Sequence, residues 1–138
     1  MTYSRKLIRE QLIDAVHGIE EATHYFQERL NDKLLLDLLI KIAMDDYSTD
    51  ASAKASYWIS HFSEDLLIEV EDKLLILQKY KLNAISAFAI IALSRINSKK
   101  GLSYLVRHRI GPKVNWWESK ALNQYLKNEG SKDCSQHY

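Results

Sequence analysis

The sequence predicts an all-α domain, and three observations lead to that prediction. The 138 residues include only four glycines and one proline, whereas strand-rich chains need frequent turns formed by these residues. Apolar residues recur every three or four positions, and no segment shows the strict alternation of a half-buried strand. Residues 84–96 form an apolar run whose only charge is Arg95, which predicts a buried central helix.

The apolar pattern predicts about seven helices. The first spans residues 4–30, and Gly18 within it favours a bend or a break there. The others are expected at residues 33–45, 50–62, 64–80, 83–97, 99–109 and 116–128. Thr49 or Asp50 is the expected N-cap of the helix at 50–62, and Ser63 is the expected N-cap of the next.

The length of the chain suits one domain with a single core, which we place at residues 1–130. Gly130 would end the last helix, and residues 131–138 are expected to form a disordered tail. The single cysteine and the charged N-terminus, which has no apolar signal segment, favour a cytoplasmic location. The apolar run at 84–96 is shorter than the roughly 20 residues that span a bilayer, so no membrane partner is expected.

The predicted helices form antiparallel pairs: 33–45 with 50–62, 64–80 with 83–97, and 99–109 with 116–128. The second helices of the first two pairs start near Asp50 and Asn83, which are 33 residues apart. A period of this length is typical of stacked helix-turn-helix repeats.

The central helix resembles the second helix of a HEAT-like repeat through Ile85, Ser86, Ala89, Ile90, Ala92, Leu93, Ser94 and Ile96. Ser94 replaces a glycine of that pattern, Leu82 and Ser86 replace its usual Asp and Arg, and Tyr57 and Trp58 stand where the preceding pair should have small residues. The resemblance covers about residues 33–110. It implies a short HEAT-like α-α superhelix whose relatives mostly bind other macromolecules, and a compact helical bundle is the alternative architecture.

The C-terminal part of the chain is basic, because residues 98–138 carry a net charge of +5 and residues 1–97 one of −4. Basic residues interleaved with aromatic ones can follow a phosphate backbone and stack on bases, and Trp and Arg also anchor protein interfaces. The candidate binding residues of this basic patch are Arg107, Arg109, Lys113, Trp116 and Trp117. The net charge of the whole chain is only +1, which favours a protein partner over nucleic acid.

Two further groups of residues are weaker candidates. An acidic patch of Asp46, Asp50, Glu64 and Asp65 would attract a basic partner, although a solvated rim with helix-capping acids explains it more simply. His17, Glu21 and His24 share one sector of the first predicted helix and could ligate a divalent metal. That sector lies opposite the apolar stripe, so a solvated face is the favoured interpretation and no cofactor is expected.

The motifs of common enzymes are missing from the sequence: it has no Gly-rich phosphate loop, zinc-spaced Cys/His set or Gly-x-Ser-x-Gly elbow. We therefore predict a non-enzymatic module that binds another protein. The specific version is an inhibitor, such as the immunity partner of a toxin domain, by analogy of size and architecture. Nucleic-acid binding and a metal-dependent activity are the alternatives.

Overall fold

The computed structural model describes residues 3–109 and 111–136, with side chains as far as residue 129. These residues form nine α-helices and one π-helical turn, and no strand, which confirms the all-α prediction. The elements are α1 (Arg5–Val16), α2 (Glu20–Gln27), α3 (Lys33–Asp45), α4 (Thr49–Ile59), α5 (Glu64–Glu69), α6 (Glu71–Leu77), α7 (Asn83–Arg95), α8 (Lys99–Tyr104), η1 (Leu105–Arg109) and α9 (Trp116–Gln136).

Two of the predicted long helices are interrupted. The first is broken at Gly18, which has a φ of +79° that glycine adopts at little cost, so α1 and α2 are separate helices. The helix expected at 64–80 is divided at Val70, whose φ of −111° and ψ of 20° end α5 and begin α6. The side chain of Val70 is buried in the core, so tertiary packing accompanies a break that no glycine or proline marks.

One predicted helix cap is wrong and the other is confirmed in position. The side chain of Ser48, not of Thr49 or Asp50, caps α4 by accepting a hydrogen bond from the Ala51 N–H at 3.2 Å. Ser63 takes the predicted N-cap position of α5, but its side chain makes no capping hydrogen bond.

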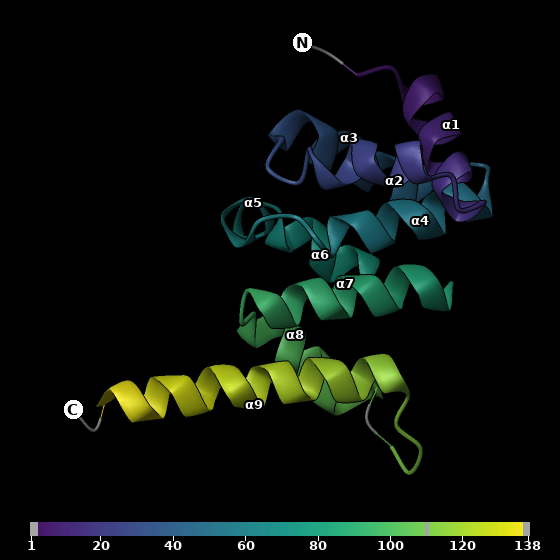
Figure 1. The fold of residues 1–138 in the computed structure, drawn as a ribbon. Helices are drawn as coiled ribbons and strands as arrows, with labels where there is room; N and C mark the ends of the chain where they lie inside the picture. The colour runs from purple at the N-terminus through teal and green to yellow at the C-terminus, as the bar shows by residue number, and fades with distance from the viewer. Residues whose placement is uncertain (1–2, 110, 137–138) are drawn as a thin grey trace.

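Helix α7 lies at the centre of the molecule, between α4 and α9, and it also packs on α6 (Figure 1). Nine of its residues are buried: Ile85, Ser86, Ala87, Ala89, Ile90, Ile91, Ala92, Leu93 and Ser94. Its buried serines bond to carbonyl oxygens, Ser86 to Gln78 at 2.7 Å and Ser94 to Ile91 at 2.6 Å. The prediction of a buried central helix is therefore confirmed.

The apolar side chains form two clusters of unequal size. The larger one runs through α1 to α7 and includes Phe26 stacked on Trp58. The smaller one joins Ile90 of α7 to Leu105, Ala121 and Tyr125. Helix α9 is thus attached to the rest of the molecule through α7 and η1.

The C-terminal part differs most from the predicted helices. The helix expected at 99–109 ends at Tyr104 and continues as the π-helical turn η1. Helix α9 continues beyond the expected end near Asn128 to Gln136. Residues 137 and 138 lie outside the described residues, so the disordered tail stays a prediction for them.

Candidate functional site

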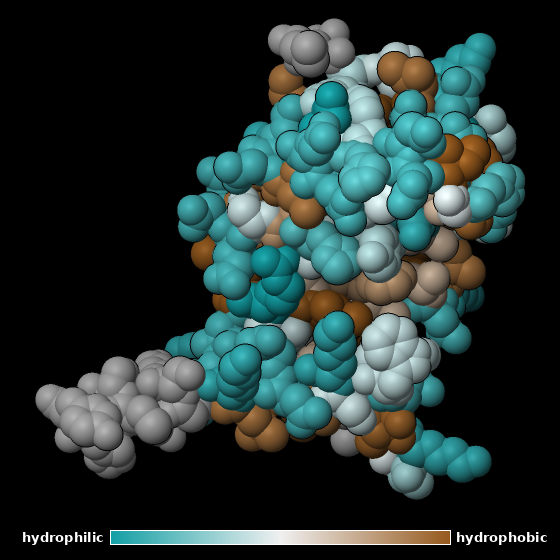
Figure 2. Space-filling model, in the orientation of Figure 1, coloured by the Kyte–Doolittle hydropathy of each residue, from teal (hydrophilic) through white to brown (hydrophobic). Residues whose placement is uncertain are grey.

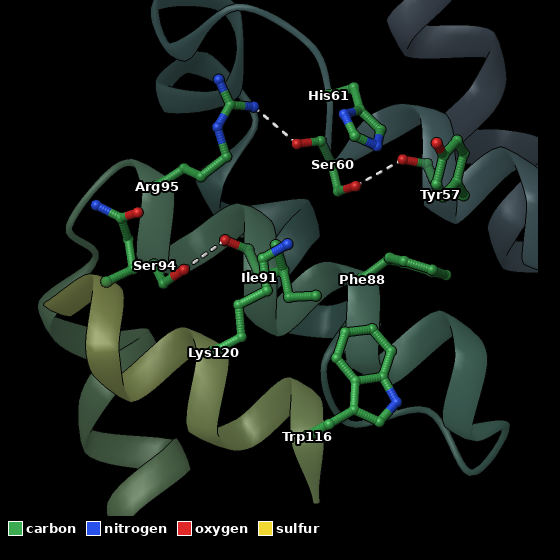
Figure 3. Close-up of a pocket in the computed structure, with 10 residues that line it drawn as sticks. Tyr57, Ser60, His61, Phe88, Ile91, Ser94, Arg95, Trp116 and Lys120 are labelled. Atoms are coloured by element: carbon green, nitrogen blue, oxygen red, sulfur yellow. Dashed lines mark hydrogen bonds between the residues drawn. The ribbon is translucent and has the colours of Figure 1, made fainter.

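A hollow of about 640 Å³ opens at the surface where α4, α7 and α9 meet (Figure 3). We call it the groove, and its lining residues are Tyr57, Ser60, His61, Phe88, Ile91, Ser94, Arg95, Trp116, Lys120 and Gln124. In the space-filling view, apolar side chains are exposed at the level of α7, between more polar surfaces above and below (Figure 2). Helices α7 and α9 each contribute both apolar and polar side chains, whereas α4 contributes Tyr57 and the turn after it contributes Ser60 and His61.

Aromatic side chains from all three helices line one side of the groove (Figure 3). The rings of Tyr57 and Phe88 meet edge to face, with centroids 5.4 Å apart. Trp116, in the first turn of α9, is 61% exposed. A large aromatic surface in contact with water at a recess is typical of binding sites.

Cationic side chains line the other side, and Arg95 is held firmly there. One terminal nitrogen of its guanidinium donates to the carbonyl oxygens of Ser60 at 2.7 Å and Phe62 at 2.6 Å. Arg95 thereby links the end of α7 to the chain that leaves α4. Figure 3 shows Lys120 of α9 between Arg95 and the aromatic side chains.

Two more titratable side chains lie near Tyr57: Lys54 of α4 and His61 of the turn after α4. The ammonium of Lys54 lies 4.2 Å from the centre of the Tyr57 ring, and burial lowers the pKa of Lys54. Partial burial lowers the pKa of His61, and the positive charges of Arg95, Lys120 and Lys54 lower it further. His61 is therefore neutral at pH 7, and the charge of the groove comes from arginine and lysine.

The groove continues along α9 as a shallower hollow of about 440 Å³, to which Trp116 and Lys120 also belong. Its other lining residues are Ser119, Asn123, Gln124 and Lys127. Asn128, one turn after Gln124, donates to the Ser94 carbonyl oxygen at 3.0 Å and accepts from Gln124 at 2.8 Å. These bonds fix the face of α9 that borders the groove.

The structure divides the predicted basic patch. Trp116 lines the groove, but Trp117 is half-buried against the smaller apolar cluster. Arg109 pairs with the buried carboxylate of Glu118, with 3.0 Å between Nε and Oε2. Arg107 and Lys113 are exposed and do not line the groove.

The predicted acidic patch is not one surface either. The carboxylate of Asp46 is fully buried against Arg5 and Arg9, so it cannot meet a partner. Asp50 lies in the first turn of α4, whereas Glu64 and Asp65 follow the opposite end of that helix. Asp50, Glu64 and Asp65 are exposed acids near helix N-termini, where they complement the helix dipole.

The predicted metal face does not form. The break at Gly18 leaves His17 at the end of α1, while Glu21 and His24 belong to α2, so the spacing of one continuous helix is lost. Among the described residues, no group of three or more His, Cys, Asp and Glu side chains is arranged to hold a metal ion.

Most groove residues are not apparent as a group in the sequence, because they come from three separate helices. One signal could have found Tyr57: it stands where the HEAT-like pattern that the sequence resembles expects a small residue for close helix packing. Phe88 lies within the central helix, where the apolar pattern predicts a core residue, but it is only half-buried and lines the groove.

Comparisons with protein-family models, with curated proteins and with solved structures find no match to this chain. Within residues 3–109 and 111–136, no helix combines the length and the apolar character needed to cross a membrane. The groove is therefore the main guide to the function.

Proposed function

We propose that the helices form a short HEAT-like superhelix, in which α4, α7 and α9 are the second helices of successive pairs. The order of contacts supports this: α3 packs on α4, α6 packs on α7, and α7 contacts both α4 and α9 (Figure 1). In stacked helical repeats, one set of equivalent helices lines an extended binding surface. The groove lies on the corresponding set of helices here.

We propose further that the protein is a non-enzymatic module that binds another protein in this groove. The observation that carries the proposal is the set of aromatic side chains that three stacked helices present around an open recess: Tyr57, Phe88 and Trp116. Aromatic residues and arginine dominate the energy of protein interfaces, and truncating such an anchor costs about 2 kcal/mol or more. Trp116 is the expected main anchor, because it has the most surface left to bury.

The more specific proposal is an inhibitor of a toxin domain, that is, an immunity protein. A compact module of 138 residues with a preformed groove is suited to covering part of a second protein. Co-expression with the product of a neighbouring toxin-like gene tests this version. The wild type should restore growth and Trp116→Ala should fail to do so, whereas equal protection by both would contradict it.

Site-specific photo-crosslinking in cells tests the binding proposal and requires no candidate partner. A benzophenone amino acid replaces Gln124 in the groove or, as the control, the exposed Lys41 of α3. We expect one discrete protein adduct from position 124, its loss in the Trp116→Ala background, and no such adduct from position 41. An adduct that forms equally at both positions, or that survives Trp116→Ala, would contradict binding in the groove.

A further inference from the structure

The charges around the groove are of one sign. Arg95, Lys120 and, in the shallower part, Lys127 line it, and none of the residues that line either hollow is acidic. Within the part of the chain that the structure describes, Lys54, Arg95 and Lys120 form no ion pair with a carboxylate. The other side chains of this surface leave these cations uncompensated, so a bound anion would gain from all of them.

Arg95 and the neighbouring Lys54 are also held in place before any partner arrives. The guanidinium of Arg95 is fixed by its bonds to two carbonyl oxygens, and the ammonium of Lys54 lies over the Tyr57 ring. Carbonyl oxygens and an aromatic ring orient a cation but do not neutralise its charge. When a carboxylate binds to such groups, the cationic side chains lose little further conformational entropy, because they are already ordered.

Arg95 and the aromatic side chains occupy opposite sides of the same recess, with Lys120 between them (Figure 3). We infer that the groove binds a segment of the partner protein in which a carboxylate side chain lies next to an aromatic or large aliphatic one. This inference rests on the proposed function and names the chemistry of the segment. The apolar side chain would pack on Trp116 and Phe88, and the carboxylate would meet Lys120 and Arg95.

The arrangement suits a peptide better than a nucleic acid. A phosphate backbone carries a charge at every nucleotide and needs a row of cations along its path. The two hollows together hold three cations, Arg95, Lys120 and Lys127, and the shallower one also offers the side chains of Ser119, Asn123 and Gln124, which can bond to a peptide backbone. Short oligonucleotides nevertheless belong in the test, because aromatic rings can also stack on bases.

Selection from a random dodecapeptide display library tests the inference. The full chain and its Trp116→Ala variant are panned in parallel, and we expect peptides with adjacent acidic and aromatic or aliphatic residues to be enriched on the wild type alone. A selected peptide should bind the Lys120→Gln variant about tenfold more weakly than the wild type. Lys41→Gln, which removes an exposed lysine of α3, is the matched control and should bind like the wild type. Thermal melting shows that each variant is folded.

A charge reversal makes the test stricter. Panning on Lys120→Glu should enrich Lys or Arg at the position where the wild type selects an acid. Enrichment that depends on Trp116 but shows no excess of acidic residues would overturn the inference and leave the binding groove in place. The absence of any Trp116-dependent enrichment would overturn both proposals. Tighter binding of a dodecathymidylate than of any selected peptide, lost in Trp116→Ala, would replace both with nucleic-acid binding.

Discussion

Asp46 offers a sharp test of the structure, because the sequence places it beside Asp45 in an apparently exposed acidic turn. Its carboxylate is fully buried, and it accepts hydrogen bonds from Arg9 Nε at 3.0 Å and from the Ser48 N–H at 3.0 Å, with Arg5 3.3 Å away. The substitution Asp46→Asn keeps the size but removes the charge that faces two arginines. Removing one partner of a fully buried ion pair costs about 3–5 kcal/mol.

The arginines reduce the expected cost, because the side chains of Arg5 and Arg9 are 35% and 17% exposed and can turn toward water. We therefore expect Asp46→Asn to lower the free energy of unfolding by about 2–3 kcal/mol, the range of hydrogen bonds to charged groups. Asp45→Asn is the matched control. Asp45 also pairs with Arg5, but its side chain is 67% exposed, and its loss should cost no more than about 1 kcal/mol.

The loss of stability caused by Asp46→Asn should become smaller at low pH. Burial raises the pKa of Asp46, but the hydrogen bonds from Arg9, Ser48 and Arg5 and the charge of Arg9 outweigh burial and hold this pKa below its usual value. A carboxyl with a lowered folded pKa stabilises fully above its unfolded pKa of about 4, and this contribution is lost as the pH falls through the folded value. The stability gap between wild type and Asp46→Asn should therefore narrow below about pH 4.

Urea unfolding, followed by circular dichroism at pH 7 and pH 3, measures these differences. We expect a large gap at pH 7 for Asp46→Asn, a small one for Asp45→Asn, and a gap for Asp46→Asn that is narrower at pH 3 than at pH 7. Equal losses for the two asparagine variants at pH 7 would refute the buried ion pair. A gap for Asp46→Asn that persists unchanged at pH 3 would refute its electrostatic origin.

Three other predictions can be checked by the same unfolding measurements. Gly101→Ala should cost about 1–3 kcal/mol, since the new Cβ would lie 2.9–3.2 Å from atoms of α7 and α9, whereas Gly111→Ala meets nothing within 4 Å and should be neutral. Ser48→Ala should cost about 1 kcal/mol through loss of the α4 cap, and more than Ser63→Ala, whose side chain makes no capping bond. Ala92→Asp places an unpaired charge at a fully buried position of α7. It should cost several kcal/mol, which is enough to unfold the domain. A variant that melts like the wild type would show that α7 is not buried.

The amino-acid pattern was enough to predict the helical class and much of the local structure. Helix α3 has the bounds that its apolar pattern predicted, and α7 is central because a helix that is apolar on every side is stable only when neighbours cover it. The break at Gly18 was also visible, since glycine adopts a positive φ without strain. The helical pattern and the break at Gly18 depend on interactions between residues a few positions apart, and the burial of α7 follows from its composition alone.

Which helix faces meet could not be predicted from the sequence, and the groove depends on these contacts. Nothing near Val70 in the sequence marks the end of α5, and the burial of Asp46 requires arginines 37 and 41 residues away. Tyr57, Phe88 and Trp116 share one groove because α4, α7 and α9 lie side by side. Helical periodicity shows which face of each helix is apolar, but the partner of that face is chosen by long-range packing, which no local pattern records.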